Sequence, residues 1–218
     1  MYLRKIVSVC LLLFALESIS AQTSEFRFGI KGGLNMSSAF FNDAEAVKFK
    51  SGYHFGGTVE YLVTPKFELQ SGIFFSNTGS KLEGYSVCVT DACKGGTITT
   101  IDAQYLKLPL YAAFITNISD NSKFKIGIGP YVGYGFAGKT TQKQNGRIEK
   151  EWDTFGDDIE ALNKYDFGAG LIADFEYNKF IFGVGFESGI INLMYKRGYF
   201  NPFEYRNVNI SISMGYKF

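Results

Sequence analysis

Hydrophobic and polar residues alternate along most of this chain with a period of two. Near its end, Ile212, Met214, Tyr216 and Phe218 share one face of an extended strand, while small or polar residues occupy the other face. Side chains of a β-strand point alternately to its two surfaces. The pattern is therefore typical of a barrel strand with lipid on one side and a polar interior on the other.

Eight segments alternate in this way and are bounded by turn-forming residues. The segment 124–138 has the clearest pattern, because Ile126, Ile128 and Val132 alternate with Lys125 and several glycines. The predicted strands are Phe26–Met36, Gly52–Val63, Phe67–Leu82, Gln104–Phe114, Phe124–Gly138, Tyr165–Tyr177, Phe180–Leu193 and Arg206–Phe218.

The connections between these strands alternate in length, long after the odd-numbered strands and short after the even-numbered ones. Outer-membrane barrels combine short periplasmic turns with longer extracellular loops. We therefore predict an all-β fold, an eight-stranded antiparallel up-and-down transmembrane β-barrel with both termini in the periplasm. An interior of this size is just wide enough for side chains to fill, so we expect a closed lumen.

The first residues fit a secretory signal peptide. Basic residues precede an apolar run over 6–16, and Ala21 places a small residue at the expected cleavage position. The alternative is a retained membrane anchor, but a spanning helix needs about 20 apolar residues. We predict a signal peptide over 1–21 and an outer-membrane barrel domain over 22–218.

The composition bears on which partners and cofactors we expect. Glycine contributes 25 of the 218 residues and aromatic residues 17%, which suits many short strands. The formal net charge of +1 offers no argument for a nucleic-acid partner. We expect contact with outer-membrane lipid, a possible protein partner at the extracellular loops, and no cofactor.

The mature chain keeps two cysteines, Cys88 and Cys93, in a polar segment. In an oxidising compartment such a pair most simply closes a small loop as a disulfide. A metal site is the alternative, but it needs more ligands, and the single histidine, His54, is far away in the sequence. We favour the disulfide.

Four stretches carry a resemblance to a known family, namely 29–35 (Gly-Ile-Lys-Gly-Gly-Leu-Asn), 104–110 (Gln-Tyr-Leu-Lys-Leu-Pro-Leu), 127–133 (Gly-Ile-Gly-Pro-Tyr-Val-Gly) and 215–218 (Gly-Tyr-Lys-Phe). On these the chain resembles the PorT-like outer-membrane β-barrel family of Bacteroidetes. The second stretch is the most specific, because proline is unusual inside a strand except at a bulge or an edge. The resemblance implies a fold and an outer-membrane address. A few members serve secretion or gliding machinery, and most have no assigned chemistry.

Charged residues fall on the faces that we expect to point inward. Two interpretations are open, a charged pore and an internal network of ion pairs, and the narrow interior favours the network. The predicted lumen residues are Arg27, Lys31, Glu60, Glu68, Lys107, Lys125, Asp166, Asp174, Glu176, Glu187 and Lys217.

His54 lies close in sequence to Ser51 and Glu60, which raises the possibility of a membrane-embedded hydrolase. Nucleophilic catalysis needs the histidine within hydrogen-bond reach of the hydroxyl and a third group that orients it. The chain has no nucleophile motif, so a structural role for the histidine is the stronger interpretation. We expect no enzyme activity and no catalytic residues.

Two long polar segments, Glu83–Ile101 and Lys139–Lys164, are predicted as loops. The second contains Trp152 and Phe155 among many acidic residues, so these aromatic side chains are candidates for a binding surface. The alternative is that 157–164 forms a short helical cap or simply a solvated loop. We expect an interaction-type barrel; the alternatives are a narrow transport channel, a component of a secretion or gliding apparatus, and a soluble lipocalin-like barrel.

Overall fold

The structure, a computed structural model, describes residues 26–41, 46–85, 96–156, 161–194 and 204–218. No helix among these residues is long and apolar enough to cross a membrane. Their strands are β1 (Phe26–Phe41), β2 (Ala46–Thr64), β3 (Phe67–Tyr85), β4 (Gly96–Ser119), β5 (Ser122–Ala137), β6 (Lys139–Gln144), β7 (Arg147–Asp153), β8 (Tyr165–Tyr177), β9 (Phe180–Gly189) and β10 (Tyr205–Lys217).

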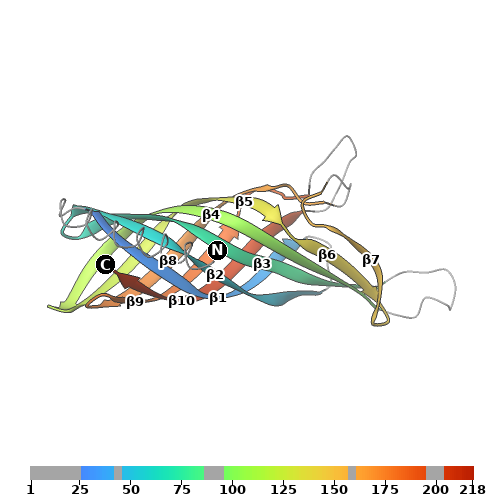
Figure 1. Ribbon diagram of the computed structural model, residues 1–218, viewed down its shortest axis with the longest axis horizontal. Coiled ribbons are helices and arrows are strands. Elements are labelled where there is room, and N and C mark those ends of the chain that lie inside the picture. The colour runs from blue at the N-terminus through green and yellow to red at the C-terminus, as the bar shows by residue number, and fades with distance from the viewer. Residues whose placement is uncertain (1–25, 42–45, 86–95, 157–160, 195–203) are drawn as a thin grey trace, which may run out of the picture.

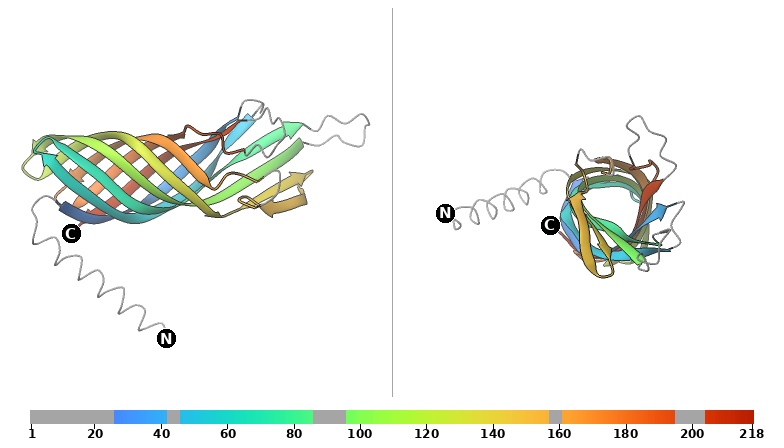
Figure 2. Two further views of the ribbon diagram at one scale, coloured as in Figure 1. Left: turned by 90° about the horizontal axis from the view of Figure 1, so that it is seen from above. Right: turned by 90° about the vertical axis from the view of Figure 1, so that its right-hand side faces the viewer.

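Eight of these strands form a closed antiparallel ring, as predicted (Figures 1 and 2). The order around the ring is β3-β2-β1-β10-β9-β8-β5-β4, and the pairing of β3 with β4 closes it. Three tight turns, at 65–66, 120–121 and 178–179, join ring strands at one end, which we call the short-turn end. Phe218 lies at this end, where its backbone N–H donates to the Phe28 carbonyl.

The segment after β5 differs from the expected loop. Strands β6 and β7 form a β-hairpin that pairs with β4 beyond the point where β5 stops, at the opposite end of the barrel (Figure 1). Asn145 and Gly146 form its turn with φ angles of 51° and 79°. An Asn-Gly pair with both φ angles positive is the preferred two-residue hairpin turn. We call this end of the barrel the hairpin end.

The other predicted loop is also partly strand. Strands β3 and β4 continue their pairing through the described parts of 83–101, as far as Tyr85 and Gly96. In contrast, β9 ends at Gly189, four residues before the predicted boundary at Leu193. Strands β1 and β2 are also longer than predicted, by five and seven residues, whereas β5, β8 and β10 are close to their predicted bounds.

The outer surface of the ring is apolar and carries aromatic residues toward both ends. Phe26 stacks near Tyr61 at the short-turn end, with ring centroids 4.7 Å apart. Toward the hairpin end, Phe75 lies between Phe55 at 5.1 Å and Phe136 at 5.8 Å. Two such girdles with an apolar band between them are the surface of an outer-membrane barrel. The band includes Ile30, Leu34, Ile73, Leu108, Leu110, Ile126, Ile128, Val132, Leu171, Val184, Ile212 and Met214.

Pro109 lies in the middle of β4, between β3 and β5. The β3–β4 ladder is interrupted there, between the Ser71–Leu110 and Phe74–Lys107 pairs, and resumes in the same register. The position is therefore neither an edge nor a bulge, although proline lacks the N–H that a ladder needs. The Ser71 hydroxyl donates to the Pro109 carbonyl at 2.8 Å and supplies one contact across the gap.

The two exposed isoleucines Ile128 and Ile148 test where lipid covers the barrel, because both side chains are 60% exposed. We expect Ile128→Arg, in the apolar band, to lower the free energy of unfolding in lipid vesicles by about 2–4 kcal/mol. Ile148→Arg, on β7, is the control, and we expect a change of about 0.5 kcal/mol or less. Equal effects in urea titrations of the two variants would contradict this assignment.

Candidate functional site

Five charged side chains form a buried ion cluster in the lumen near the short-turn end. The Lys125 ammonium lies 3.0 Å from Glu60, 2.6 Å from Glu68 and 2.9 Å from Glu176. Lys217 contacts Glu60 at 2.6 Å and also contacts Glu176. Charged groups removed from water are strongly destabilising unless they are paired. The ion cluster therefore fills this part of the lumen with mutually dependent charges.

Each member of the ion cluster comes from a different strand, β2, β3, β5, β8 or β10. Alternate residues of every ring strand point inward, so one long side chain from each can reach the axis. Gln70 adds a hydrogen bond of 2.7 Å to Glu68 from the same face of β3. The second carboxylate oxygen of Glu68 has no hydrogen-bond partner in the described part of the chain.

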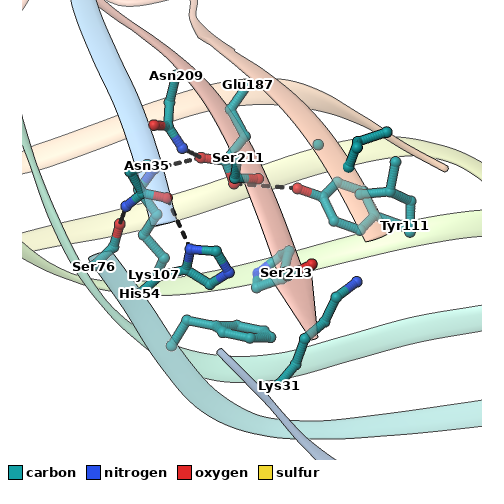
Figure 3. A pocket seen from close by; sticks show the side chains of 15 residues that line it. Lys31, Asn35, His54, Ser76, Lys107, Tyr111, Glu187, Asn209, Ser211 and Ser213 are labelled. Carbon is teal, nitrogen blue, oxygen red and sulfur yellow. Dashed lines mark hydrogen bonds and ion pairs between the residues drawn. The ribbon is translucent and has the colours of Figure 1, made fainter. Parts of the chain in front are cut away.

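The middle of the lumen contains two small cavities. A cavity of about 80 Å³ surrounds His54 (Figure 3), and another of about 50 Å³ lies beside the Lys31–Asp174 ion pair. The two cavities share Phe74 and Ile172 among their lining side chains. Cavities of this size hold a few water molecules. They are far smaller than pockets for drug-sized ligands, which are about 300–1,000 Å³.

The imidazole of His54 is held by Asn35, with 2.8 Å between its Nδ1 and the amide oxygen (Figure 3). The Asn35 amide nitrogen donates to the Ser76 hydroxyl and to the carbonyls of Tyr53 and Asn77, at 3.1–3.2 Å. These acceptors fix the amide orientation, so its oxygen accepts a hydrogen bond. In the neutral histidine the proton therefore sits on Nδ1, and the Nε2 lone pair is the acceptor.

Ser51, His54 and Glu60, on which the hydrolase hypothesis rests, do not meet at one site in the structure. Ser51 is exposed on the outer face of β2, whereas His54 points into the lumen. Glu60 belongs to the ion cluster and binds two lysines. A nucleophile and its base must be within hydrogen-bond reach, and this pair lies on opposite faces of one strand.

Toward the hairpin end, Glu187 organises a second group of polar side chains. It forms an ion pair of 2.5 Å with Lys107 and accepts hydrogen bonds from Tyr111 and Asn209, both at 3.3 Å. The Lys107 ammonium also lies 4.9 Å from the centroid of the Tyr131 ring. The amide oxygen of Asn209 has no hydrogen-bond partner among the described residues.

Two of the predicted lumen charges stand outside the ion pairs of the described chain. Asp166 is fully buried and accepts hydrogen bonds from Asn207 at 2.8 Å and Tyr131 at 3.3 Å. Arg27 lies at the short-turn end, beside a surface depression that Pro65 and Asn117 also line. In contrast, the predicted lumen residues Lys31 and Asp174 form an ion pair of 2.7 Å with each other.

An apolar plug closes the lumen at the hairpin end. Phe155 is 7% exposed, and its ring packs edge-on against Tyr105 with centroids 5.2 Å apart. Gly135 makes room for this ring, because a Cβ there would lie 2.3 Å from a Phe155 ring carbon. The expectation that Phe155 is an exposed binding residue is therefore wrong. We define the apolar plug as Ala39, Ile101, Ala103, Tyr105, Phe155, Leu162, Leu193 and Tyr205.

Trp152 is half-buried on β7, and the Lys150 ammonium lies 4.8 Å from its ring centroid. Its indole N–H has no hydrogen-bond partner in the described part of the chain. On the hairpin, Lys139 and Glu151 form an exposed ion pair of 2.7 Å. The hydrogen bond from Lys139 lowers the pKa of the Glu151 carboxyl.

Two predictions made from the sequence lie outside the described residues. They are the signal peptide over 1–21 and the disulfide between Cys88 and Cys93. Among the residues that are described, no group of three or more His, Cys, Asp or Glu side chains is arranged to hold a metal ion.

Comparisons with known proteins agree with this architecture. The family model described as outer membrane protein beta-barrel domain matches residues 20–195. No curated protein matches the sequence significantly. One similar solved structure is Ail, the attachment invasion locus protein of Yersinia pestis, in complex with the heparin analogue sucrose octasulfate. It shares 13% identity and a TM-score of 0.40, over 89% of this chain and 99% of that one.

Two further solved structures are similar at comparable levels. The outer membrane protein OprG from Pseudomonas aeruginosa is 15% identical with a TM-score of 0.45, over 89% of this chain and 96% of that one. The outer membrane protease OmpT from Escherichia coli is 9% identical with a TM-score of 0.39, over 90% and 99%. At such identities these likenesses concern the fold alone.

Lys125 forms more ion pairs than any other member of the ion cluster, so replacing it should destabilise the barrel. We expect Lys125→Met to lower the free energy of unfolding by about 3–5 kcal/mol, because three buried carboxylates lose a partner. Adding Glu68→Gln to Lys125→Met should restore part of the lost free energy of unfolding. Lys123→Met, on the same strand, is the control, with an expected change of about 0.5 kcal/mol or less. Equal stability of Lys125→Met and the wild type in urea would count against the cluster.

Proposed function

Because the chain belongs to the outer membrane protein beta-barrel domain family and is an outer-membrane protein, we propose that it acts as an interaction-type barrel. In this proposal the hairpin end is extracellular and presents a surface to partner proteins or ligands. The lumen conducts no solute, and the protein carries out no reaction. The short turns then lie in the periplasm, which is the general orientation of outer-membrane barrels.

The observation that carries this proposal is the blockage of the lumen at two levels. The ion cluster occupies the short-turn end, with the Lys125 side chain 1% exposed. The apolar plug occupies the hairpin end, where Tyr105, Leu193 and Tyr205 are fully buried. A solute would have to displace both, so the barrel is better suited to act through its outer surfaces.

The β6–β7 hairpin is the strongest candidate for that outer surface. It projects beyond the ring beside β4 (Figure 2), and among the described strands β7 pairs with β6 alone, so its other edge has no strand partner there. Every residue of β7 except Trp152 is exposed. Surfaces held on a rigid scaffold commonly carry binding functions.

The family subgroup, the signal peptide and the disulfide are also proposals. The Tyr-Leu-x-Leu-Pro-Leu element of β4 supports membership of the PorT-like group of Bacteroidetes, some of whose members serve secretion or gliding machinery. The early apolar run and Ala21 support a cleaved signal peptide. The polar setting of Cys88 and Cys93 supports a disulfide in the loop between β3 and β4. A role in a secretion or gliding assembly would be one form of the proposed interaction.

Affinity purification tests the role of the hairpin. The tagged barrel is isolated from gently solubilised outer membranes, and its partners are identified by mass spectrometry. Gly146→Val forces a β-branched residue to a φ of 79°, where it is a steric outlier, so it should distort the hairpin alone. Asn145→Gly is the matched control, since glycine adopts positive φ freely.

We expect a stoichiometric protein partner with the wild type and with Asn145→Gly, and a loss of most of that partner with Gly146→Val. Both variants should keep the thermal stability of the wild-type barrel, because the hairpin lies outside the ring. Equal partner recovery from all three proteins would argue against the hairpin as the interaction surface. Recovery of a lone barrel in every case would argue against a protein partner.

A further inference from the structure

The outward face of β4 changes from apolar to polar where it leaves the girdle. Leu110 and Leu106 are each 48% exposed and face lipid on alternate positions of the strand. The same face continues toward the hairpin end with Gln104, Asp102 and Thr100. A lipid whose chains lie along the leucines would therefore have its headgroup beside these polar side chains.

A groove with a volume of about 710 Å³ lies at this position. Strands β3 and β4, the end of β5 and the β6–β7 hairpin supply its lining residues. Phe136 lines it and is 47% exposed, and this residue also belongs to the aromatic girdle through its contact with Phe75. Aromatic girdles mark the membrane–water interface. The groove therefore begins at the level of the lipid headgroups.

The lining of the groove suits a ligand rich in hydroxyl groups. Asp102 is held in place by Asn77 at 2.7 Å and Lys50 at 3.1 Å. Gln104 and Asp153 also line the groove and supply an amide and a carboxylate. Hydrogen-bonding groups beside an aromatic face can orient a sugar ring through its hydroxyls and pack against its C–H surface.

The groove and its rim carry three carboxylates, of Asp102, Glu151 and Asp153, and two lysines, Lys50 and Lys139. Lys50 lies against Asp102, and Lys139, which lines the groove with Asp153, is paired with Glu151 at the rim. Among the described residues that line the groove, Lys139 is the one cation and it is already paired, so a headgroup with only phosphate would find no unpaired cation there. A sugar headgroup, which offers both donors and acceptors, matches the mixture of amide, carboxylate and hydroxyl groups.

We propose that this groove binds the sugar headgroup of an outer-leaflet glycolipid whose acyl chains lie along Leu106, Leu108 and Leu110. The proposal deepens the proposed function by naming a ligand class, and it rests on the extracellular placement of the hairpin end. The alternation along β4 carries it, since one face of one strand supplies both the chain-binding and the headgroup-binding surfaces. This alternation continues where the pairing of β4 with β5 shifts by one residue, between Gln104 and Tyr105.

Titrations of the delipidated full-length barrel in mild detergent test the proposal. The probes are purified lipopolysaccharide, phosphatidylethanolamine, and the oligosaccharide released from the same lipopolysaccharide. The first variant combines Gln104→Ala with Asp153→Ala, and the second is Phe136→Leu. Phe55→Leu is the matched control for the second, because Phe55 also stacks on Phe75 but does not line the groove.

We expect lipopolysaccharide to bind more tightly than either other probe. The double variant should weaken that binding by about tenfold, which corresponds to the loss of one or two hydrogen bonds. Phe136→Leu should also weaken it, and Phe55→Leu should not. Circular dichroism melting establishes that each variant is folded.

Three results would overturn the proposal. They are equal affinity for phosphatidylethanolamine, equal affinity for the released oligosaccharide, and unchanged binding by a folded double variant. The second result would assign the groove to free saccharides in place of a membrane lipid. The partner recovery described above for Gly146→Val is measured separately, so failure of the lipid proposal and failure of the protein-interaction proposal can be told apart.

Discussion

The backbone must satisfy its own hydrogen bonds wherever it meets lipid, and the rest of the structure depends on this constraint. The pairing of β3 with β4 closes the ring and leaves no free strand edge within it. A ring of eight strands encloses only the width of its own side chains. Interior charges are therefore cut off from bulk water and must pair with each other, as Lys125 does with three glutamates.

The same constraint gives the inner and outer surfaces of the ring different contacts. Inward residues interact with each other, through the ion cluster, the Glu187 group and the apolar plug. Outward residues meet lipid between the girdles, and the hairpin extends one side of the ring beyond them. Because the interior is occupied by structural contacts, the binding surfaces that we propose lie at the hairpin end.

The ring could be predicted from the sequence because apolar and polar side chains alternate along a half-buried strand with a period of two residues. Alternation such as that of Ile126 and Ile128 with Lys125 identifies both the strand and its lipid face. The β6–β7 hairpin was missed although Asn145-Gly146 is a strong turn signal, because β7 has charged residues on both faces. Phe155 was misplaced because nothing local to the sequence shows that its ring folds back over Gly135. The Asn35–His54 contact likewise depends on the register of β1 and β2, which only the structure supplies.

The central claim is that the lumen is closed, and single-channel recording in planar lipid bilayers tests it most directly. The account predicts that the folded wild-type barrel produces no stable unit conductance at any applied voltage, because the ion cluster and the apolar plug block the lumen at two levels. A reproducible unit conductance from folded protein, absent from a heat-denatured sample of the same preparation, would contradict that claim.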